Sequence, residues 1–101
     1  MAASDYDARY ETFSSILGPL NDTIVGTPTV TVARQDGQPI APEDLAVVSG
    51  TITIDSTALV VTFWLQAGTN LAIYAIAVTV ITVAGRKITR TGTISVVKQL
   101  G

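Results

Sequence analysis

The stretch Leu71–Lys87, LAIYAIAVTVITVAGRK, decides how this chain can fold, because so long an apolar run must be kept from water. A membrane-spanning helix needs about 20 apolar residues. Only 14 residues run from Leu71 to Ala84, before Gly85-Arg86, and many of them are β-branched. Branching at Cβ favours strands over helices. The stretch therefore predicts a β-strand and argues against a membrane segment.

The predicted strand has two alternating sets of side chains, and both sets are largely apolar. One set is Tyr74, Ile76, Val78 and Val80, and the other is Ile73, Ala75, Ala77, Ile81 and Val83. Successive side chains of a strand point to opposite faces, and the core of a sandwich covers only one face. We therefore expect the second face to pack against another chain, with Ile73 and Ile81 as interface residues.

The rest of the chain has the composition of an all-β protein. Twelve Val, ten Ile and fifteen Thr make up 37 of the 101 residues. Strand-like runs lie near 22–25, 28–34, 46–54 with a break at Ser49-Gly50, 58–66, 71–83 and 86–97. Six or seven short strands separated by turn residues predict an immunoglobulin-like β-sandwich over residues 21–101. The last two strands form a long hairpin that turns at Ala84-Gly85.

The core of this sandwich is predicted mainly from the last strands. Phe63 and Trp64 are adjacent in a strand, so one points inward and the other outward. A Trp in the middle of a sandwich is usually buried, and we expect Trp64 to point inward. The predicted core residues are Trp64, Tyr74, Ile76, Val78, Val80, Ile94 and Val96.

Residues 1–20 form a separate leading segment. Tyr6, Tyr10, Phe13 and Leu17 fall on one face of a helix, and Gly18-Pro19 would end it. An extended arm that uses the same aromatic residues as anchors is the alternative. In either form, Tyr6, Tyr10 and Phe13 are predicted interface residues.

Charged residues are few and are sorted along the chain. They make up 14% of the sequence, against about 25% in ordinary soluble domains. All eight acidic residues lie at or before Asp55, whereas Arg86, Lys87, Arg90 and Lys98 follow it. The two halves could neutralise each other within one fold, or the acidic face of one subunit could meet the basic face of the next in a ring.

Three of these cations, Arg86, Lys87 and Arg90, form a basic cluster on the last hairpin. Phosphate is a conceivable ligand, but the net charge is −2 and no aromatic residue is interleaved with the cluster to stack on bases. We expect the cluster to pair with carboxylates of the same or a neighbouring chain, and not with nucleic acid.

Residues suited to catalysis are scarce. The chain contains no His and no Cys, which removes the commonest general base and metal ligands. The close carboxylate pairs Asp5/Asp7 and Glu43/Asp44 are interpreted as solvated turn residues. We predict no enzyme activity, catalytic residue, metal site or cofactor. The start of the chain lacks the pattern of an export signal, so we expect folding in a cytoplasm.

Several motifs resemble those of a known family. They are Gly18-Pro19, Asp22-Thr23-Ile24, Trp64-Leu65, Ala67-Gly68-Thr69, Tyr74, Thr82, Ala84-Gly85-Arg86 and Arg90. In this pattern the chain resembles the small immunoglobulin-like proteins of tailed bacteriophages that act as fibre-to-tail adaptors. It departs from them at Ala67, where Gly is common, and in the leading segment, where Phe13 is the nearest match to a family Trp.

The resemblance implies a structural component of the virion without catalytic activity. Its partners would be other phage proteins of the tail, connector or fibre, and copies of itself in a ring. A capsid decoration or cement protein of the same fold is an alternative. A carbohydrate-binding sandwich module of a fibre or adhesin is another, and it would gather aromatic residues on one exposed face or loop.

Overall fold

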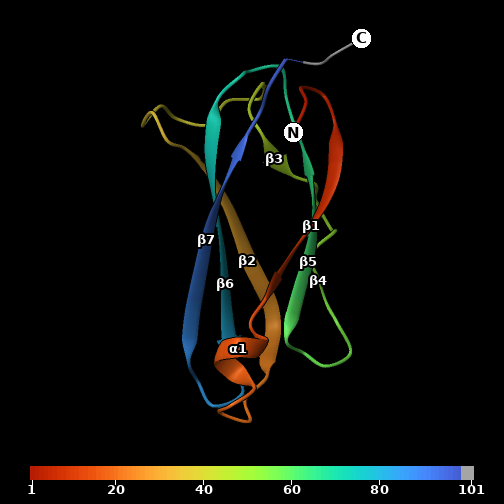
Figure 1. The fold of residues 1–101 in the computed structure, drawn as a ribbon, viewed down its shortest axis with the longest axis vertical. Coiled ribbons are helices and arrows are strands. Elements are labelled where there is room, and N and C mark those ends of the chain that lie inside the picture. The colour runs from red at the N-terminus through yellow and green to blue at the C-terminus, as the bar shows by residue number, and fades with distance from the viewer. Residues whose placement is uncertain (99–101) are drawn as a thin grey trace.

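Two antiparallel sheets packed face to face form the fold in the computed structural model, which describes residues 1–98 (Figure 1). In the first sheet, β5 (Val60–Gln66) pairs with β1 (Tyr6–Thr12) on one side and with β3 (Ala46–Val47) and β4 (Thr53–Ile54) on the other. In the second sheet, β6 (Ile73–Thr82) lies between β2 (Ile24–Arg34) and β7 (Lys87–Ser95). The predicted all-β sandwich is confirmed. The last three residues of the predicted 21–101 domain lie outside the described residues.

The strand connectivity is that of an immunoglobulin domain, which builds one sheet from strands A, B, E and D and the other from C, F and G. Here β1, β5 and the β3/β4 pair take the places of B, E and D, and β2, β6 and β7 take those of C, F and G. No strand within residues 1–98 takes the place of A. The one-turn helix α1 (Ser14–Leu17) joins β1 to β2 at one end of the sandwich (Figure 1).

Two predicted strands are joined into one in the structure, whereas a third predicted run is divided at its expected break. The runs 22–25 and 28–34 form the single strand β2, because a register shift between Val25 and Thr29 absorbs Gly26 and Pro28 as an irregularity instead of a break. Such positions are where a strand tolerates Pro, which has no N–H to donate. The run 46–54 is divided into β3 and β4 by a turn in which Gly50 has a φ of 76°, as its Ser49-Gly50 signal predicts.

The leading segment is not a helix from Tyr6 onward. Residues 6–12 form β1 and pair with β5 at every position, and only Ser14–Leu17 are helical. A spacing of four residues, as between Tyr6 and Tyr10, fits one face of a strand as well as one face of a helix. The spacing therefore could not distinguish the two, and backbone pairing with β5 favours the strand.

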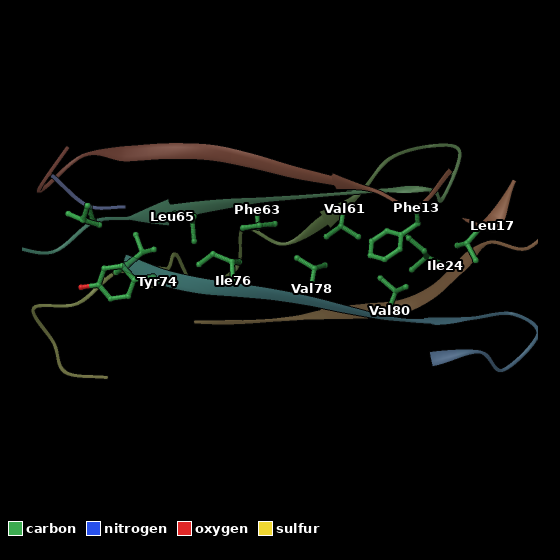
Figure 2. Packing of buried hydrophobic residues seen from close by; sticks show 13 residues of the cluster. Phe13, Leu17, Ile24, Val61, Phe63, Leu65, Tyr74, Ile76, Val78 and Val80 are labelled. Atoms are coloured by element: carbon green, nitrogen blue, oxygen red, sulfur yellow. The ribbon is translucent and has the colours of Figure 1, made fainter. Parts of the chain in front are cut away.

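The core lies between the sheets and is closed at one end by α1. Figure 2 shows Val61, Phe63 and Leu65 of β5 facing Tyr74, Ile76, Val78 and Val80 of β6. Phe13 and Leu17 enter the same cluster beside α1. Val96 is buried, and Ile94 is half-buried and packs against the cluster. The β6 residues predicted for the core thus all lie in it.

Trp64 is not in the core, and the prediction that it points inward is wrong. Its exposed fraction is 44%, whereas that of Phe63 is 3%. The physical reason is the alternation of side chains along β5. Phe63 shares its face of the strand with Val61 and Leu65, whereas Trp64 shares its face with Thr62 and Gln66. Burying Phe63 therefore removes three apolar side chains of β5 from water, whereas burying Trp64 would remove one.

Candidate protein-protein interfaces

The outer face of the second sheet is uncharged over most of its length and rich in alanine and threonine. On β6 it carries Ile73, Ala75, Ala77, Thr79 and Ile81, which alternate with the buried set. The register places Ala33, Thr31 and Thr29 of β2 and Thr93, Thr91 and Thr89 of β7 beside them. Ile73 and Ile81 are 49% and 46% exposed. Lys87 is opposite Ile81, and at the other end of the face Ile73 lines a pocket together with Arg34 and Asp36.

The outer face of the first sheet carries exposed aromatic side chains. Trp64 of β5 is opposite Ala8 of β1, so Tyr6 and Tyr10 are its diagonal neighbours on the same face. Tyr6 is 59% and Tyr10 is 73% exposed. The charged residues of β1 lie at the alternate positions and point toward the other sheet. Three of the six aromatic residues therefore gather on one uncharged face.

Phe13 is not part of this face, and its prediction as an interface residue is wrong. It is fully buried and its N–H donates to the Leu59 carbonyl at 2.8 Å. The strand parity that exposes Tyr6 and Tyr10 turns Phe13 inward, where it packs with Leu17 of α1. Of the three aromatic residues predicted as anchors, only the two tyrosines are exposed.

Two of the three residues of the basic cluster form ion pairs with acidic residues of the same chain. Arg86 Nη1 lies 2.7 Å from Asp22 Oδ2, and Arg90 Nε lies 2.9 Å from Glu11 Oε1. The second pair joins β7 to β1 across the gap between the two sheets. Lys87 has no ionic partner within residues 1–98. Neutralisation within one chain therefore accounts for Arg86 and Arg90.

Asp22 is buried at the end of the sandwich near α1 and holds the β6–β7 turn in place. It accepts hydrogen bonds from the backbone N–H of Ala84 at 3.2 Å and of Thr23 at 3.0 Å, in addition to Arg86. The pKa of Asp22 is lowered from 3.8 to about 2, chiefly by a hydrogen bond from the Thr82 hydroxyl. The carboxylate therefore stays ionised and acts as a fixed acceptor.

Asp44 is a second buried hydrogen-bond acceptor, at the end of the sandwich opposite α1. Its interpretation as a solvated turn residue is wrong. It is 2% exposed and accepts hydrogen bonds from the Tyr74 hydroxyl at 2.7 Å, Asn70 Nδ2 at 3.0 Å and the Ala41 N–H at 2.8 Å. Arg34 NH1 lies 3.3 Å from it. The pKa of Asp44 is lowered to about 2, chiefly by the Tyr74 hydrogen bond. An acid-base catalyst needs a pKa near the working pH, so both aspartates are suited to structure instead.

Among the residues that the structure describes, no group of three or more His, Cys, Asp or Glu side chains lies together in a way that could hold a metal ion. Within the same residues, no helix has the length and hydropathy to cross a membrane.

The two candidate faces are only partly visible in the sequence. Alternation within 71–83 indicates Ile73 and Ile81, and the leading segment supplies Tyr6 and Tyr10 as predicted interface residues. That these tyrosines share a face with Trp64 is not predicted, because Trp64 is expected in the core and residues 1–20 outside the sandwich. Two signals in the sequence together indicate the aromatic face. Tyr6, Ala8 and Tyr10 alternate with charged residues as in a strand, and the residues two positions from Trp64 on either side are polar.

Taken together, the chain is an immunoglobulin-type sandwich of two antiparallel sheets, each with large exposed apolar side chains on its outer face. The family model of the podophage GP4 fiber-tail adaptor protein gp77 matches residues 2–95. The chain therefore belongs to this family of phage adaptor proteins, as its motifs predict. A comparison with curated proteins gives no match.

Proposed function

We propose that this chain is a non-catalytic adaptor subunit of a tailed-phage virion, joining a tail or connector protein to a fibre or a neighbouring protein. The family supports the adaptor role. The observation that carries the proposal is the pair of exposed outer faces, poor in charged residues, on opposite sides of the sandwich. An adaptor must hold two partners at once, and two opposed faces let it do so without either partner blocking the other.

The two faces differ in chemistry, which supports different partners for each. The outer face of the second sheet offers aliphatic and threonine side chains on a regular sheet and suits flat packing against another sheet, including a second copy in a ring. The outer face of the first sheet offers Tyr6, Tyr10 and Trp64, the residue types that most often dominate binding energy at protein interfaces. The subunit would be synthesised and assembled in the host cytoplasm.

The proposal is tested by single-cysteine accessibility in purified virions. The chain contains no Cys, so each variant carries one thiol. Ala8→Cys reports the aromatic face, Thr31→Cys the outer face of the second sheet, and Gln38→Cys an exposed loop as the control. We expect the first two thiols to react with maleimide at least about tenfold more slowly in virions than in the free chain, as buried interface positions should. The control should change little.

Three outcomes would count against it. Absence of the chain from purified particles would exclude a virion role. Equal reactivity of Ala8→Cys and Thr31→Cys in virions and in the free chain would exclude contacts through these faces. Location on the capsid surface by electron microscopy would support the decoration alternative instead.

The aromatic face also favours a second candidate, a carbohydrate-binding module, because sugars stack on exposed aromatic rings and Gln66 and Thr62 lie beside Trp64 on the same face. A glycan array probed with the isolated chain decides this. A reproducible hit that Trp64→Ala abolishes would support sugar binding. Protection of Ala8→Cys by a protein partner in virions would argue for the adaptor role.

A further inference from the structure

Strand β7 has a free edge along the side that faces away from β6. The Val96 N–H donates to the Ala72 carbonyl at 2.9 Å, so the even-numbered residues of β7 bond to β6. In an antiparallel ladder the alternate residues direct their N–H and C=O groups to the opposite side. Thr89, Thr91 and Thr93 therefore present backbone donors and acceptors to whatever lies beyond the edge.

One end of this edge is already bonded to residues 1–3, which run parallel to it. The Met1 ammonium donates to the Ser95 carbonyl at 3.0 Å, the Val97 N–H donates to the Met1 carbonyl at 2.9 Å, and the Ala3 N–H donates to the Val97 carbonyl at 2.9 Å. Ala2 and Val97 form a parallel bridge. A segment that continued this ladder backward from Met1 would bond first to the Ser95 N–H and the Thr93 carbonyl. Two residues further back, it would bond to the Thr93 N–H and the Thr91 carbonyl.

A groove of about 170 Å³ runs beside this free edge, between β7 and β1. The core residues Phe63, Ile76 and Val78 reach its floor, and Arg9 and Glu11 line its other wall. An extended segment placed along β7 could therefore bury apolar side chains against existing core residues. Met1 and Ala3 already pack against the core in this way.

Gly92 lines this groove together with Thr93 and Ile94 of β7, and nothing within residues 1–98 requires it to be glycine. It is opposite Ile76, its φ is not positive, and a Cβ placed on it would meet no atom within 4 Å. Glycine weakens the interior of a strand and commonly marks a place where another backbone approaches closely. No such backbone lies there within residues 1–98, so the space fits a segment from outside the described fold.

The edge of β1 across the groove carries more inward charges than the edge of β7, whose inward charged residue, Arg90, pairs with Glu11 at 2.9 Å. The inward positions of β1 are Asp7, Arg9 and Glu11, and Arg9 pairs with Asp7 at 3.0 Å. Charged residues that point inward on an edge strand are a common device against strand addition. The β7 edge has threonines at its outward positions, which suit a strand partner.

From these observations we propose that β7 accepts an extended segment of another protein chain as a fourth strand of the second sheet, parallel to β7 and in line with Met1–Ala3. Backbone ladder bonds would supply the affinity, and small apolar side chains at alternate positions would enter the groove over Gly92. The site is distinct from the two outer sheet faces and does not rest on their role.

The test adds a strand-forming segment to the N-terminus of the full chain, so that the chain itself can fill the edge of β7. The hexapeptide Val-Thr-Val-Thr-Val-Thr, placed directly before Met1, puts valines in phase with Met1 and Ala3. We expect the amide hydrogens of Thr91, Thr93 and Ser95 to exchange at least about tenfold more slowly than in the unextended chain, because they become ladder donors. The amides of Gly92 and Ile94, which already face β6, serve as internal references.

Matched variants show whether this protection comes from strand addition. A Gly-Ser hexapeptide of the same length should give no protection. In the strand-extended chain, Thr93→Pro removes the outward N–H without removing a bond to β6, and Gly92→Val fills the groove; both should reduce the protection. Protection equal to that of the Gly-Ser extension, or protection on Ala8 and Tyr10 of β1, would overturn the proposal.

Incorporation into virions tests whether the natural donor is another chain. The strand-extended protein has its edge filled and should be incorporated at least about tenfold less than the Gly-Ser-extended protein. Equal incorporation of the two proteins would show that no other chain uses this edge, and would overturn the proposal even where the exchange result is as expected. Absence of both proteins and of the unextended chain from virions would contradict the adaptor role and, with it, a donor in the virion.

Discussion

The hydroxyl of Tyr74 donates a hydrogen bond of 2.7 Å to Asp44 Oδ1, and both residues are buried. The same hydroxyl lies 3.4 Å from the carbonyl of Asn70, four residues upstream. This is the place of the tyrosine corner in immunoglobulin domains, where a Tyr at the start of strand F bonds back to the preceding connection. Here Asp44 adds a carboxylate that ties the corner to the loop before β3.

Tyr74→Phe should lower the free energy of unfolding by about 1.5 to 3 kcal/mol, the usual worth of a hydrogen bond to a charged group. The ring stays in the core, so the loss reports the hydroxyl. Tyr10→Phe is the matched control, because its side chain is 73% exposed, and it should change stability by no more than about 0.5 kcal/mol. Urea denaturation of the two variants measures both values. Equal effects would mean that the Asp44 contact does not stabilise the fold.

Acid should destabilise the chain between about pH 4 and about pH 2. The pKa values of Asp22 and Asp44 are both lowered from 3.8 to about 2 by hydrogen bonds, from Thr82 and Tyr74 respectively. The unfolded chain therefore binds protons in this range before the folded chain does. The stability that these two carboxylates contribute is fully present above their ordinary pKa of 3.8. It is lost as the pH falls through their pKa of about 2 in the folded chain.

Denaturant midpoints at about pH 5 and about pH 2.5 measure this loss. Asp44→Asn should be less stable at the higher pH and should lose less stability on acidification than the unsubstituted chain. Asp5→Asn, on the exposed N-terminal turn, is the control and should retain the full pH dependence. A midpoint that does not move with pH would contradict the role given to the two buried carboxylates.

The sequence could predict those parts of the fold that depend on local pattern. The β6–β7 hairpin, the break at Gly50 and the two alternating sets of β6 follow from period-two alternation and turn residues, and all are present. The sequence could not decide between the helical and the extended form of the leading segment, because Tyr6 and Tyr10 are four residues apart, a spacing common to strands and helices. The pairing with β5 that decides the matter joins residues 48 to 60 positions apart, from Thr12 with Val60 to Tyr6 with Gln66, which no local pattern can report.

The same limit applies to the buried carboxylates and to the candidate sites. Asp22 meets Arg86 across 64 positions of sequence, and Asp44 meets Tyr74 across 30. In sequence both aspartates resemble ordinary turn residues. The groove over Gly92 was invisible for a similar reason, since it exists only where β1 and β7 come from opposite ends of the chain to the same side of the sandwich.

Phe63 and Trp64 should respond oppositely to removal of the ring. Phe63→Ala leaves a cavity between the sheets and should lower the free energy of unfolding by about 3 to 5 kcal/mol. Trp64→Ala removes a side chain from an exposed face and should cost no more than about 1 kcal/mol. Thermal or denaturant unfolding of both variants measures the difference. A larger loss for Trp64→Ala would mean that strand parity in β5 is reversed.

Ile73→Asp and Ile81→Asp should leave folding nearly unchanged and reduce assembly. Both side chains are about half exposed, so each substitution should alter the free energy of unfolding by no more than about 1 kcal/mol. Ile81→Asp even places its carboxylate opposite Lys87, where an opposite charge is favourable. In an interface, however, either buried carboxylate would lose its water without a partner and should reduce incorporation into virions at least about tenfold.

The control for this pair is Ile40→Asp, because Ile40 has a similar exposed fraction, 46%, but lies in the loop before β3 and not on the outer face of the second sheet. It should fold and be incorporated normally. Normal incorporation of Ile73→Asp would exclude that end of the face from the interface, whereas loss with Ile40→Asp as well would point to general sensitivity to added charge. Loss with Ile73→Asp and Ile81→Asp alone requires a partner that covers both ends of β6, because the register separates them by nearly the whole strand.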